Sequence, residues 1–548
     1  MTTPAQLTDA LVRDARFALR VLRKSPVFTA TAVLTLALGI GANATVFSMV
    51  DALLLRSLPY PEPERLAVVS TVYRSPDGGG EQTAQDGHTW EALRGHAELT
   101  DLAVTGYPTG VNLYAGGRAV HLEQQRVSAG FFRVLGVAPR LGREFASEED
   151  VAGGPAVAVL SHGLWQSAFG GDPGIVGGAV HLNGEPHTVV GVMPEGFRST
   201  FPADLWTPLR PATSGEGGGT NYQIVARLAP GATWERAGAE VDALAGPVWE
   251  ERFGADAAER GVSATFSLVP LRSALTEGLR WPLVLLWSAV GLVLVVVCAN
   301  LASLMLARSS GRTREIAARI ALGGGRGAVM RQILVESLVL AVAGGALGLV
   351  FGAMGSQALS ALAADTLHLG QPVALDARVA AAMVVLALAT SLAFGLGPAF
   401  HVSALDPRAV LADGGGRGAS AGAVGWSRRA LVTAEIAVGV VLLVFAGLLA
   451  RTFVNLRSLD PGFEPAGVVA GSVSLQDARY ETRERIAALV DESLERLRAT
   501  PGVEGAAVSL GLPYQRLLNL GFRGPLPDGG LSDWRAVSTS YVTPGFFE

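Results

Sequence analysis

The chain has 548 residues, of which 49% are hydrophobic and only 17% are charged. A typical soluble protein carries roughly 25% charged residues, so this composition argues against a wholly soluble protein and against a disordered one. The formal net charge of −5 is too small and too mixed in sign to favour a nucleic-acid partner. Cys298 is the only cysteine, which excludes an intrachain disulfide and a multi-cysteine metal site.

Five apolar stretches are long enough to cross a bilayer as helices. They cover residues 26–50, 281–307, 332–362, 377–400 and 430–450. Within the first stretch, Ala42-Asn43-Ala44 resembles a signal-peptide cleavage site. However, the apolar run continues to Leu55, which is longer than the core of a signal peptide. We therefore predict a membrane anchor there and a multi-pass α-helical membrane protein overall.

Arginine placement predicts the orientation of these spans in the plasma (inner) membrane, because basic loops stay in the cytoplasm. Arginines are concentrated in residues 1–25, 308–331 and 401–429, which fall on one side if all five stretches cross. The N-terminus is then cytoplasmic, and segments 51–280 and 451–548 are extracytoplasmic.

Residues 1–25 also show helical periodicity ahead of the first span. Apolar residues recur on one face and arginines on another, which is typical of an amphipathic helix lying on the inner leaflet. The apolar positions are Leu7, Leu11, Ala15, Ala18 and Leu22. The alternative is a plain cluster of orienting charges.

The extracytoplasmic segment 51–280 is predicted to be an α+β domain. Short β-like runs cover residues 157–160, 180–182 and 188–192, and Asn183-Gly184 is a hairpin signal between two of them. Residues 235–253 are predicted to form a helix. His181 and His187 flank the hairpin turn, and we interpret them as hairpin surface rather than as a metal site.

A short motif occurs twice in the chain. Val127-Ser-Ala-Gly-Phe-Phe in the first outer segment matches Val542-Thr-Pro-Gly-Phe-Phe in the second, and each follows an equivalent span. This pattern predicts an internal duplication of a unit built from a span, an outer domain and further spans. The second unit, with residues 451–548 as an incomplete outer domain, is then expected to be truncated.

Gly418-Ala-Ser-Ala-Gly422 formally matches a hydrolase motif, but no strand is predicted before it and we interpret it as chance. No enzyme activity, cofactor or metal site is therefore expected in this chain. Lys24 is the only lysine and has no glycine-rich surroundings, which excludes a phosphate-binding loop of the Walker type. If ATP is used, another polypeptide must bind it. Glu336 is expected at the cytoplasmic end of its span, where it can reach the interface.

Two patterns concern contacts between helices or proteins. Gly344, Gly348 and Gly352 are spaced four apart in the third span, which predicts close packing against another helix. The cytoplasmic stretch that follows the second span has helical periodicity with both signs of charge and a few apolar residues, as a docking surface for a soluble partner would have. The residues concerned are Arg312, Arg314, Glu315, Ile316, Arg319 and Leu322. From the residues alone, a simple orienting loop explains the arginines equally well.

This stretch, with its continuation from Arg331 to Ser337, resembles the cytoplasmic signature of MacB/FtsX-type ABC transporter permeases. The N-terminal run from Phe17 to Asn43 and the Leu58-Pro-Tyr-Pro, Gly130-Phe-Phe and Gly191-Val-Met-Pro motifs are similar to the duplicated orphan permeases of that superfamily. The resemblance implies extracytoplasmic domains of the MacB periplasmic core type. It also implies a separate cytoplasmic ATPase that contacts the loop from Arg312 to Gly323. Ala317 replaces a glycine that family members often carry after the Glu-Ile pair.

The resemblance leads to one main functional hypothesis. The chain is expected to couple ATP hydrolysis by its partner to movements of the outer domains, for export or extraction of an unknown substrate. Expected partners are the ATPase subunit, membrane lipids and a second permease copy, and no nucleic acid. The alternative is a membrane scaffold that regulates an envelope hydrolase without transport, and a secondary carrier is disfavoured because the spans lack buried ion pairs.

Overall fold

The structure is a computed structural model, and it describes most of the chain. The described residues are 4–76, 78–115, 118–213, 215–311, 315, 325–367, 375–403, 421–464, 466–471, 473, 475, 480, 482–513, 518–522, 524, 530 and 535–547.

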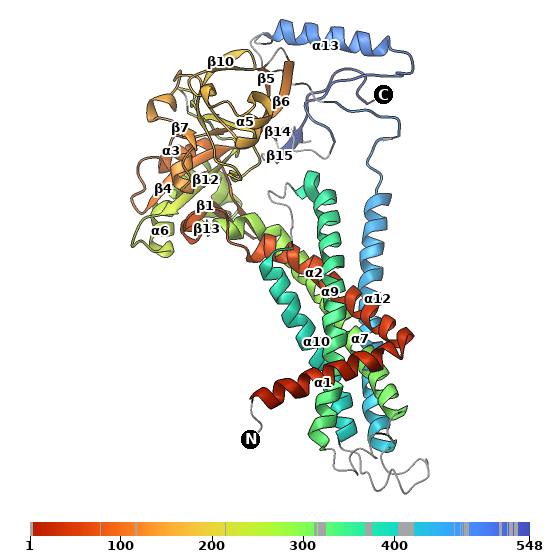
Figure 1. The fold of residues 1–548 in the computed structure, drawn as a ribbon. Helices are drawn as coiled ribbons and strands as arrows, with labels where there is room; N and C mark the ends of the chain where they lie inside the picture. Colours follow the sequence, from red (N-terminus) through yellow and green to blue (C-terminus); the bar gives the residue numbers. More distant parts are fainter. Residues whose placement is uncertain are drawn as a thin grey trace. The chain divides into compact units, whose positions relative to one another are not determined.

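The chain divides into two compact units, which are drawn together in Figure 1. The first unit comprises residues 1–72, 226–241 and 265–468, and the second comprises residues 73–225, 242–264 and 469–548. Strands β1, β12 and β13 each have residues in both units.

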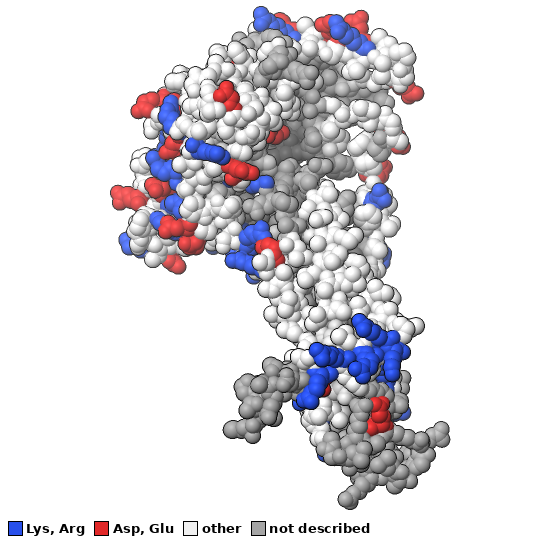
Figure 2. All heavy atoms as spheres, viewed as in Figure 1, with Lys and Arg blue, Asp and Glu red and all other residues white. Residues whose placement is uncertain are grey.

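The first unit is dominated by long helices. They are α1 (Pro4–Arg23), α2 (Pro26–Val50, continued by the π-helix η1, Asp51–Leu55), α7 (Leu271–Gly311), α9 (Arg326–Leu367), α10 (Ala377–Ser403) and α12 (Ala421–Ser458). Within the described residues, five helices are long and apolar enough to cross a membrane, as the sequence predicted. Figure 2 shows few charged side chains over these helices, whereas basic side chains gather on α1.

The helices extend beyond the predicted spans. Helix α7 begins at Leu271 rather than at residue 281, and α9 begins at Arg326 rather than at residue 332. The reason is that hydropathy detects only the apolar part of a helix, while backbone hydrogen bonding continues through the polar turns on either side. The predicted loop 308–331 is correspondingly shorter in the structure, because both of its ends are helical.

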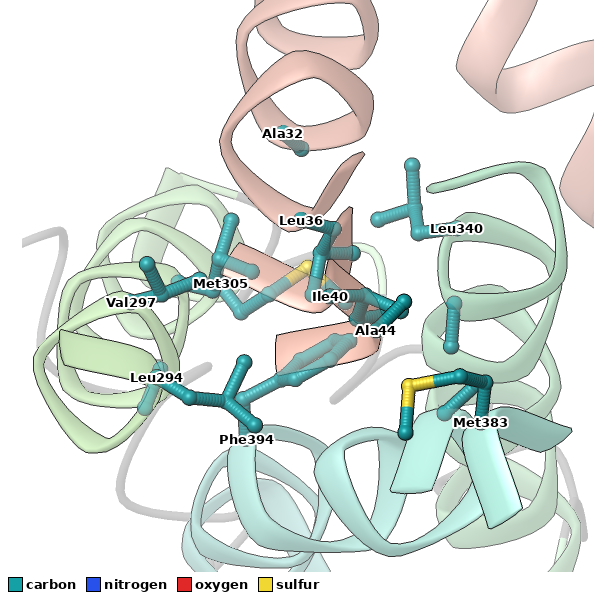
Figure 3. Packing of buried hydrophobic residues seen from close by; sticks show 14 of the residues in the cluster. Ala32, Leu36, Ile40, Ala44, Leu294, Val297, Met305, Leu340, Met383 and Phe394 are labelled. Atoms are coloured by element: carbon teal, nitrogen blue, oxygen red, sulfur yellow. The ribbon is translucent and has the colours of Figure 1, made fainter. Parts of the chain in front are cut away.

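Helices α2, α7, α9 and α10 lie side by side around one apolar core (Figure 3). Side chains from all four helices converge there: Ala32, Leu36, Ile40 and Ala44 from α2, Leu294, Val297 and Met305 from α7, Leu340 from α9, and Met383 and Phe394 from α10. Helix α12 differs, because none of the 18 residues in its most apolar segment is buried. Its apolar side chains therefore remain available to lipid or to another subunit.

One sequence expectation for these helices is wrong. Glu336 does not reach outward, because it is only 4% exposed. Gln332, one turn earlier on α9, donates a hydrogen bond from Nε2 to Glu336 Oε1 at 3.2 Å. This bond partly compensates for burying the carboxyl group.

The remaining elements form the extracytoplasmic fold predicted for residues 51–280. The strands are β1 (Leu66–Ser75), β2 (Gly78–Gln82), β3 (Ala84–Gln85), β4 (Thr100–Gly106), β5 (Thr109–Ala115), β6 (Arg118–Val127), β7 (Leu141–Gly142), β8 (Val157–Leu160), β9 (Ala179–Leu182), β10 (Glu185–Val192), β11 (Leu205–Pro208), β12 (Tyr222–Leu228) and β13 (Ser263–Pro270). The helices are α3 (Gly87–Leu93), α4 (Phe131–Leu135), α5 (His162–Phe169) and α6 (Trp234–Glu259), with short 3₁₀ turns η2 (Pro63–Arg65), η3 (Ser147–Glu149) and η4 (Pro173–Ile175).

Six of these strands close into a ring. The strand order is β11-β8-β10-β9-β5-β6-β4-β12-β1-β13, and β11 also pairs with β6. Strands β11, β8, β10, β9, β5 and β6 therefore form a small closed barrel, which leaves none of the six with an open edge. Its interior is filled by aliphatic side chains that include Val111, Leu160, Val180 and Leu205.

The predicted hairpin is confirmed and joins β9 to β10. Asn183 and Gly184 have φ of +52° and +85°, as a two-residue turn of type I′ requires. The pairing places His187 opposite Val180 and His181 opposite Pro186. His187 consequently lies on the buried side of the hairpin with 6% exposure, so its interpretation as hairpin surface is wrong, whereas His181 is exposed.

The second outer segment contains α13 (Arg483–Arg498) and the pair β14 (Leu518–Phe522) and β15 (Arg535–Thr539). Its copy of the repeated motif makes the same two hydrogen bonds as the first copy, one through the backbone amide and one through the side-chain hydroxyl. The amide of Ser128 donates to Val104 O, and Ser128 Oγ accepts from the Val104 amide. Thr543 makes the same two bonds with Val508. The likeness of the two motif copies therefore extends from sequence to hydrogen-bond pattern, and the duplication of the whole unit stays a prediction.

The two copies differ in what covers their phenylalanine pairs. The glycine before each pair, Gly130 or Gly545, has a left-handed backbone conformation, with φ of +83° and +85°. Phe132 is buried beneath Phe145, Phe197 and Trp206. The equivalent Phe547 is 89% exposed among the described residues.

Candidate functional site

The predicted docking stretch lies between the end of α7 and the start of α9, and both flanking helices hold α1. Arg308, in the last turn of α7, donates from Nη2 to Val21 O and Ser25 Oγ, each at 3.2 Å. Its guanidinium carbon lies 4.5 Å from the centre of the Phe28 ring. Carbonyl groups at a helix end lack intrahelical partners, so an arginine there satisfies part of the C-terminal end of α1.

The second flanking helix holds α1 through an ion pair. Arg331, in the second turn of α9, places Nε 2.6 Å from Asp14 Oδ2. Ala18 and Leu22 of α1 are buried. The apolar face of α1 therefore packs at least partly on protein, while Arg16, Arg20 and Arg23 stay exposed. We call this arrangement of α1 with Arg308 and Arg331 the inner junction.

The structure describes only part of the predicted docking surface. Glu315 is exposed. The other five residues predicted with it, Arg312, Arg314, Ile316, Arg319 and Leu322, lie outside the described residues. The structure adds the contacts that Arg308 and Arg331, on either side of this stretch, make with α1, and the sequence patterns did not reveal them.

The three glycines of the third span face α2. A Cβ atom at Gly344 would lie 2.5 Å from Leu36 Cβ, and one at Gly352 would lie 2.5 Å from Ala44 Cβ. At Gly348 it would lie 3.1 Å from Ala37 O. Hydrogen thus occupies the place of a side chain at each contact, and α2 and α9 approach as small-residue helices do. On α2, Gly41 completes the seam against Phe351, a contact that the spacing of residues within one helix does not reveal.

At the opposite ends of the helices, charged groups tie three chain segments together. Arg56 Nη2 lies 2.6 Å from Asp376 Oδ2, directly before α10. Arg272, in the first turn of α7, donates from Nη2 to Arg56 O at 2.7 Å. Hydrogen bonds from the backbone amides of Val379 and Arg378, with the nearby Arg56 charge, hold the pKa of the Asp376 carboxyl below its usual range. We call this group of Arg56, Arg272 and Asp376 the outer junction.

The sequence contained a weak signal for the outer junction. Arg56 and Asp376 each lie just beyond an apolar run, where charges normally serve only as interface anchors, whereas Arg272 lies nine residues before its run. The contacts join residues that are far apart in the sequence: Arg272 and Arg56 are separated by 216 positions, and Arg56 and Asp376 by 320. A chain read from one end to the other gives no reason to join them.

Comparison with known proteins assigns both membrane and outer parts. Residues 29–244 match the MacB-like periplasmic core domain, and residues 287–407 match the FtsX-like permease C-terminal domain. The chain is 24% identical over 283 residues to the "Uncharacterized ABC transporter permease YknZ" of Bacillus subtilis, covering 51% of this chain and 67% of that protein. It is 27% identical over 301 residues to the "Macrolide export ATP-binding/permease protein MacB" of Hahella chejuensis, covering 54% of this chain and 43% of that protein.

Solved structures with similar parts include "the extracellular domain of noncanonic ABC-type transporter YknZ from Gram-positive bacteria", at 15% identity and a TM-score of 0.27 over 37% of this chain and 99% of that one. The periplasmic region of MacB from Actinobacillus actinomycetemcomitans is similar at 14% identity and a TM-score of 0.27, over 38% of this chain and 91% of that one. These TM-scores are too low to add to the family matches. The chain spans less than half of the MacB relative. With a MacB-like periplasmic core domain followed by an FtsX-like permease domain on membrane-spanning helices, the chain belongs to the MacB/FtsX-like ABC transporter permeases.

Proposed function

We propose that the chain transmits force from a separate cytoplasmic ATPase to its extracytoplasmic domain, for export or extraction of a substrate. The observation that supports this most directly is the course of α7. It is one helix from Leu271 to Gly311, about 60 Å long at 1.5 Å per residue. It follows strand β13 without a loop and ends at the predicted docking stretch.

Both ends of α7 are attached to neighbouring helices. Arg308 ties its last turn to α1, and Arg272 ties its first turn to Arg56, which follows α2 and η1. Strand β1, which α2 leads into, pairs with β13. A displacement of the docking stretch is therefore expected to move α1 and α7 together and to reach two paired strands of the outer sheet. We place the N-terminus and the docking stretch in the cytoplasm on the arginine distribution.

Replacing Glu315 by lysine tests where the ATPase docks. Inverting one charge in a docking surface should weaken association by about 1–3 kcal/mol, depending on how desolvated the contact is. Membrane insertion should survive, because an added positive charge reinforces a cytoplasmic orientation. The expected result is a normally inserted protein that retains at least fivefold less of its ATPase subunit on purification. Glu148→Lys, at an exposed position in the outer domain, is the matched control.

Arg308→Gln separates docking from transmission. It leaves the docking stretch unchanged but removes the charged tie between α7 and α1. The ATPase should still bind, while its stimulation by the permease should fall. Wild-type association and wild-type ATP-dependent activity in Glu315→Lys would refute the docking site. A stable complex with an envelope hydrolase, with no exported compound, would favour the scaffold role instead.

A further inference from the structure

A cavity of about 470 Å³ lies at one end of the closed six-stranded ring in the outer domain. Its lining comes from the start of β5, the end of β6, the β9–β10 turn and the end of β11. The pairing of Thr109 with Gln124, and of Arg126 with Thr207, brings the start of β5 and the ends of β6 and β11 together. The mouth of a small barrel is a usual place for a ligand site, because the filled interior stops short of the rim.

One residue of the lining, Arg210, is held in an unfavourable backbone conformation. Its φ is +49°, in the left-handed region that residues other than glycine rarely adopt. The Arg210 amide donates to Asp150 Oδ1 at 3.1 Å, and the Ala129 amide donates to Asp150 Oδ2 at 2.9 Å. Asp150 is 1% exposed, so a buried carboxylate fixes this backbone from beneath. Strain maintained in this way is characteristic of functional positions.

The side chain of Arg210 faces a carboxylate and a buried histidine across the cavity. Its Nη1 lies 3.2 Å from Glu185 Oε1. His187 Nδ1 lies 3.0 Å from the Glu185 carbonyl oxygen, which can only accept, so Nδ1 carries the proton. Burial lowers the pKa of His187, and the ring is therefore neutral near pH 7 with Nε2 as an acceptor.

The charges of the lining select the kind of ligand. Arg126 and Arg210 contribute two positive charges and Glu185 contributes one negative charge, so the lining has a net charge of about +1. Arg126 already bonds to Leu209 O and Glu216. For Arg210, the described part of the chain supplies an acceptor to Nη1 and none to Nε or Nη2. A guanidinium presents its donors as a fork that fits a carboxylate at two points.

We propose that this barrel-mouth cavity binds a small organic carboxylate, of about the size of a blocked dipeptide, whose carboxylate takes the place of Glu185 on Arg210. Glu185 is half exposed and swings into solvent when the ligand enters. Thr109, Gln124 and Asn183 supply donors and acceptors for the polar groups beside the ligand carboxylate. The site is independent of the proposed coupling to an ATPase.

The proposal is tested by binding measurements on the full-length protein in lipid nanodiscs without nucleotide. The probe is N-acetyl-alanyl-alanine, compared with its C-terminal amide by saturation-transfer NMR and calorimetry. The acid should bind and the amide should bind at least tenfold more weakly. Arg210→Gln should lower the affinity for the acid at least tenfold, because it removes the charged fork while keeping a polar side chain.

Glu185→Gln provides a variant whose effect has the opposite sign. Removing the internal carboxylate that competes for Arg210 should raise the affinity for the acid at least threefold, an effect that damage to the fold cannot produce. Arg133→Gln, at an exposed arginine that does not line the cavity, should leave binding unchanged. The proposal is overturned by equal binding of acid and amide, by no binding of the acid at millimolar concentration, by unchanged binding in Arg210→Gln, by weaker binding in Glu185→Gln, or by tighter binding of inorganic phosphate.

Discussion

Replacing Gly352 by alanine should separate α2 from α9 and destabilise the membrane unit. The new Cβ would lie 2.5 Å from Ala44 Cβ, whereas carbon atoms in contact prefer about 3.5–4.0 Å. Ala44 has no rotamer through which to escape, so the helix backbones must move apart by about 1 Å. Overpacking of this kind typically costs about 1–3 kcal/mol.

The single cysteine offers a reporter for this measurement. Cys298 lies on α7, partly buried against the four-helix core, and should react faster with a thiol-specific fluorophore as that core opens. Heating the purified full-length protein in detergent with such a dye gives an apparent melting temperature, which we expect to fall by several degrees in Gly352→Ala. The swapped variant Ala44→Gly/Gly352→Ala moves the methyl group to the other helix and should recover most of the loss.

Gly439→Ala on α12 is the matched control, because a Cβ there meets nothing within 4 Å. It should leave the melting temperature unchanged or raise it slightly, since alanine is the better helix former. The close contact between α2 and α9 would be refuted by an unchanged melting temperature in Gly352→Ala. It would also be refuted if the melting temperature fell equally in Gly352→Ala and Gly439→Ala.

Further outcomes follow from the topology, the charges and the exposure. A reporter enzyme that is active only on the extracytoplasmic side should be active when fused after Gly79 or Asp528. A reporter that is active only in the cytoplasm should be active when fused after Gly324 or Gly415. A cytoplasmic signal after Gly79 would overturn the predicted orientation. The thermal stability of the outer domain should fall as the pH drops below about 6.5. Burial lowers the pKa of His187 in the folded domain, so the unfolded chain, where the pKa has its ordinary value of 6.5, binds the proton more strongly. Melting temperatures of His187→Gln should lack this part of the pH dependence. Residues 456–548 expressed alone should be protease-sensitive while 52–280 alone is folded, because most described hydrophobic side chains of the former are exposed; a sharp cooperative transition for 456–548 would contradict this.

Local signals predicted a large part of this fold. Bilayer thickness sets the length of an apolar helix, so hydropathy found the five spans of the described residues without knowledge of their neighbours. The Asn183-Gly184 turn is specified by the two residues that adopt positive φ. Even the burial of His187 was readable, because a two-residue turn places it opposite Val180 on the apolar face of the hairpin. The error was to treat both histidines alike when strand alternation separates them.

The junctions and the barrel mouth could not be predicted in the same way. Arg308 bonds to a backbone carbonyl 287 positions away, and a carbonyl has no sequence signature. Closure of the ring depends on parallel pairing of β6 with β11, strands whose residues are about 80 positions apart. The left-handed backbone of Arg210 is stabilised by Asp150 rather than by any turn residue of its own. Each of these features is a long-range contact, and their polar partners become visible only when the fold brings them together.

The distribution of close contacts also limits which parts of the membrane unit can move. The glycine seam joins α2 to α9 at backbone distance, so these two helices should respond as one body. Helix α7 has no such seam at Gly291, where a Cβ would meet nothing within 4 Å. Its polar ties include the arginines at its two ends and one bond near its middle, which Asn43 Nδ2 of α2 donates to Val290 O at 3.2 Å. Ends held by single arginines can change partners at a cost of a few kcal/mol, whereas a seam without side chains cannot slide without clashes. We therefore expect ATP-dependent motion to appear as movement of α7 against the α2–α9 pair, with Arg272 and Arg308 as attachments at its ends and the Asn43–Val290 hydrogen bond as an attachment near its middle.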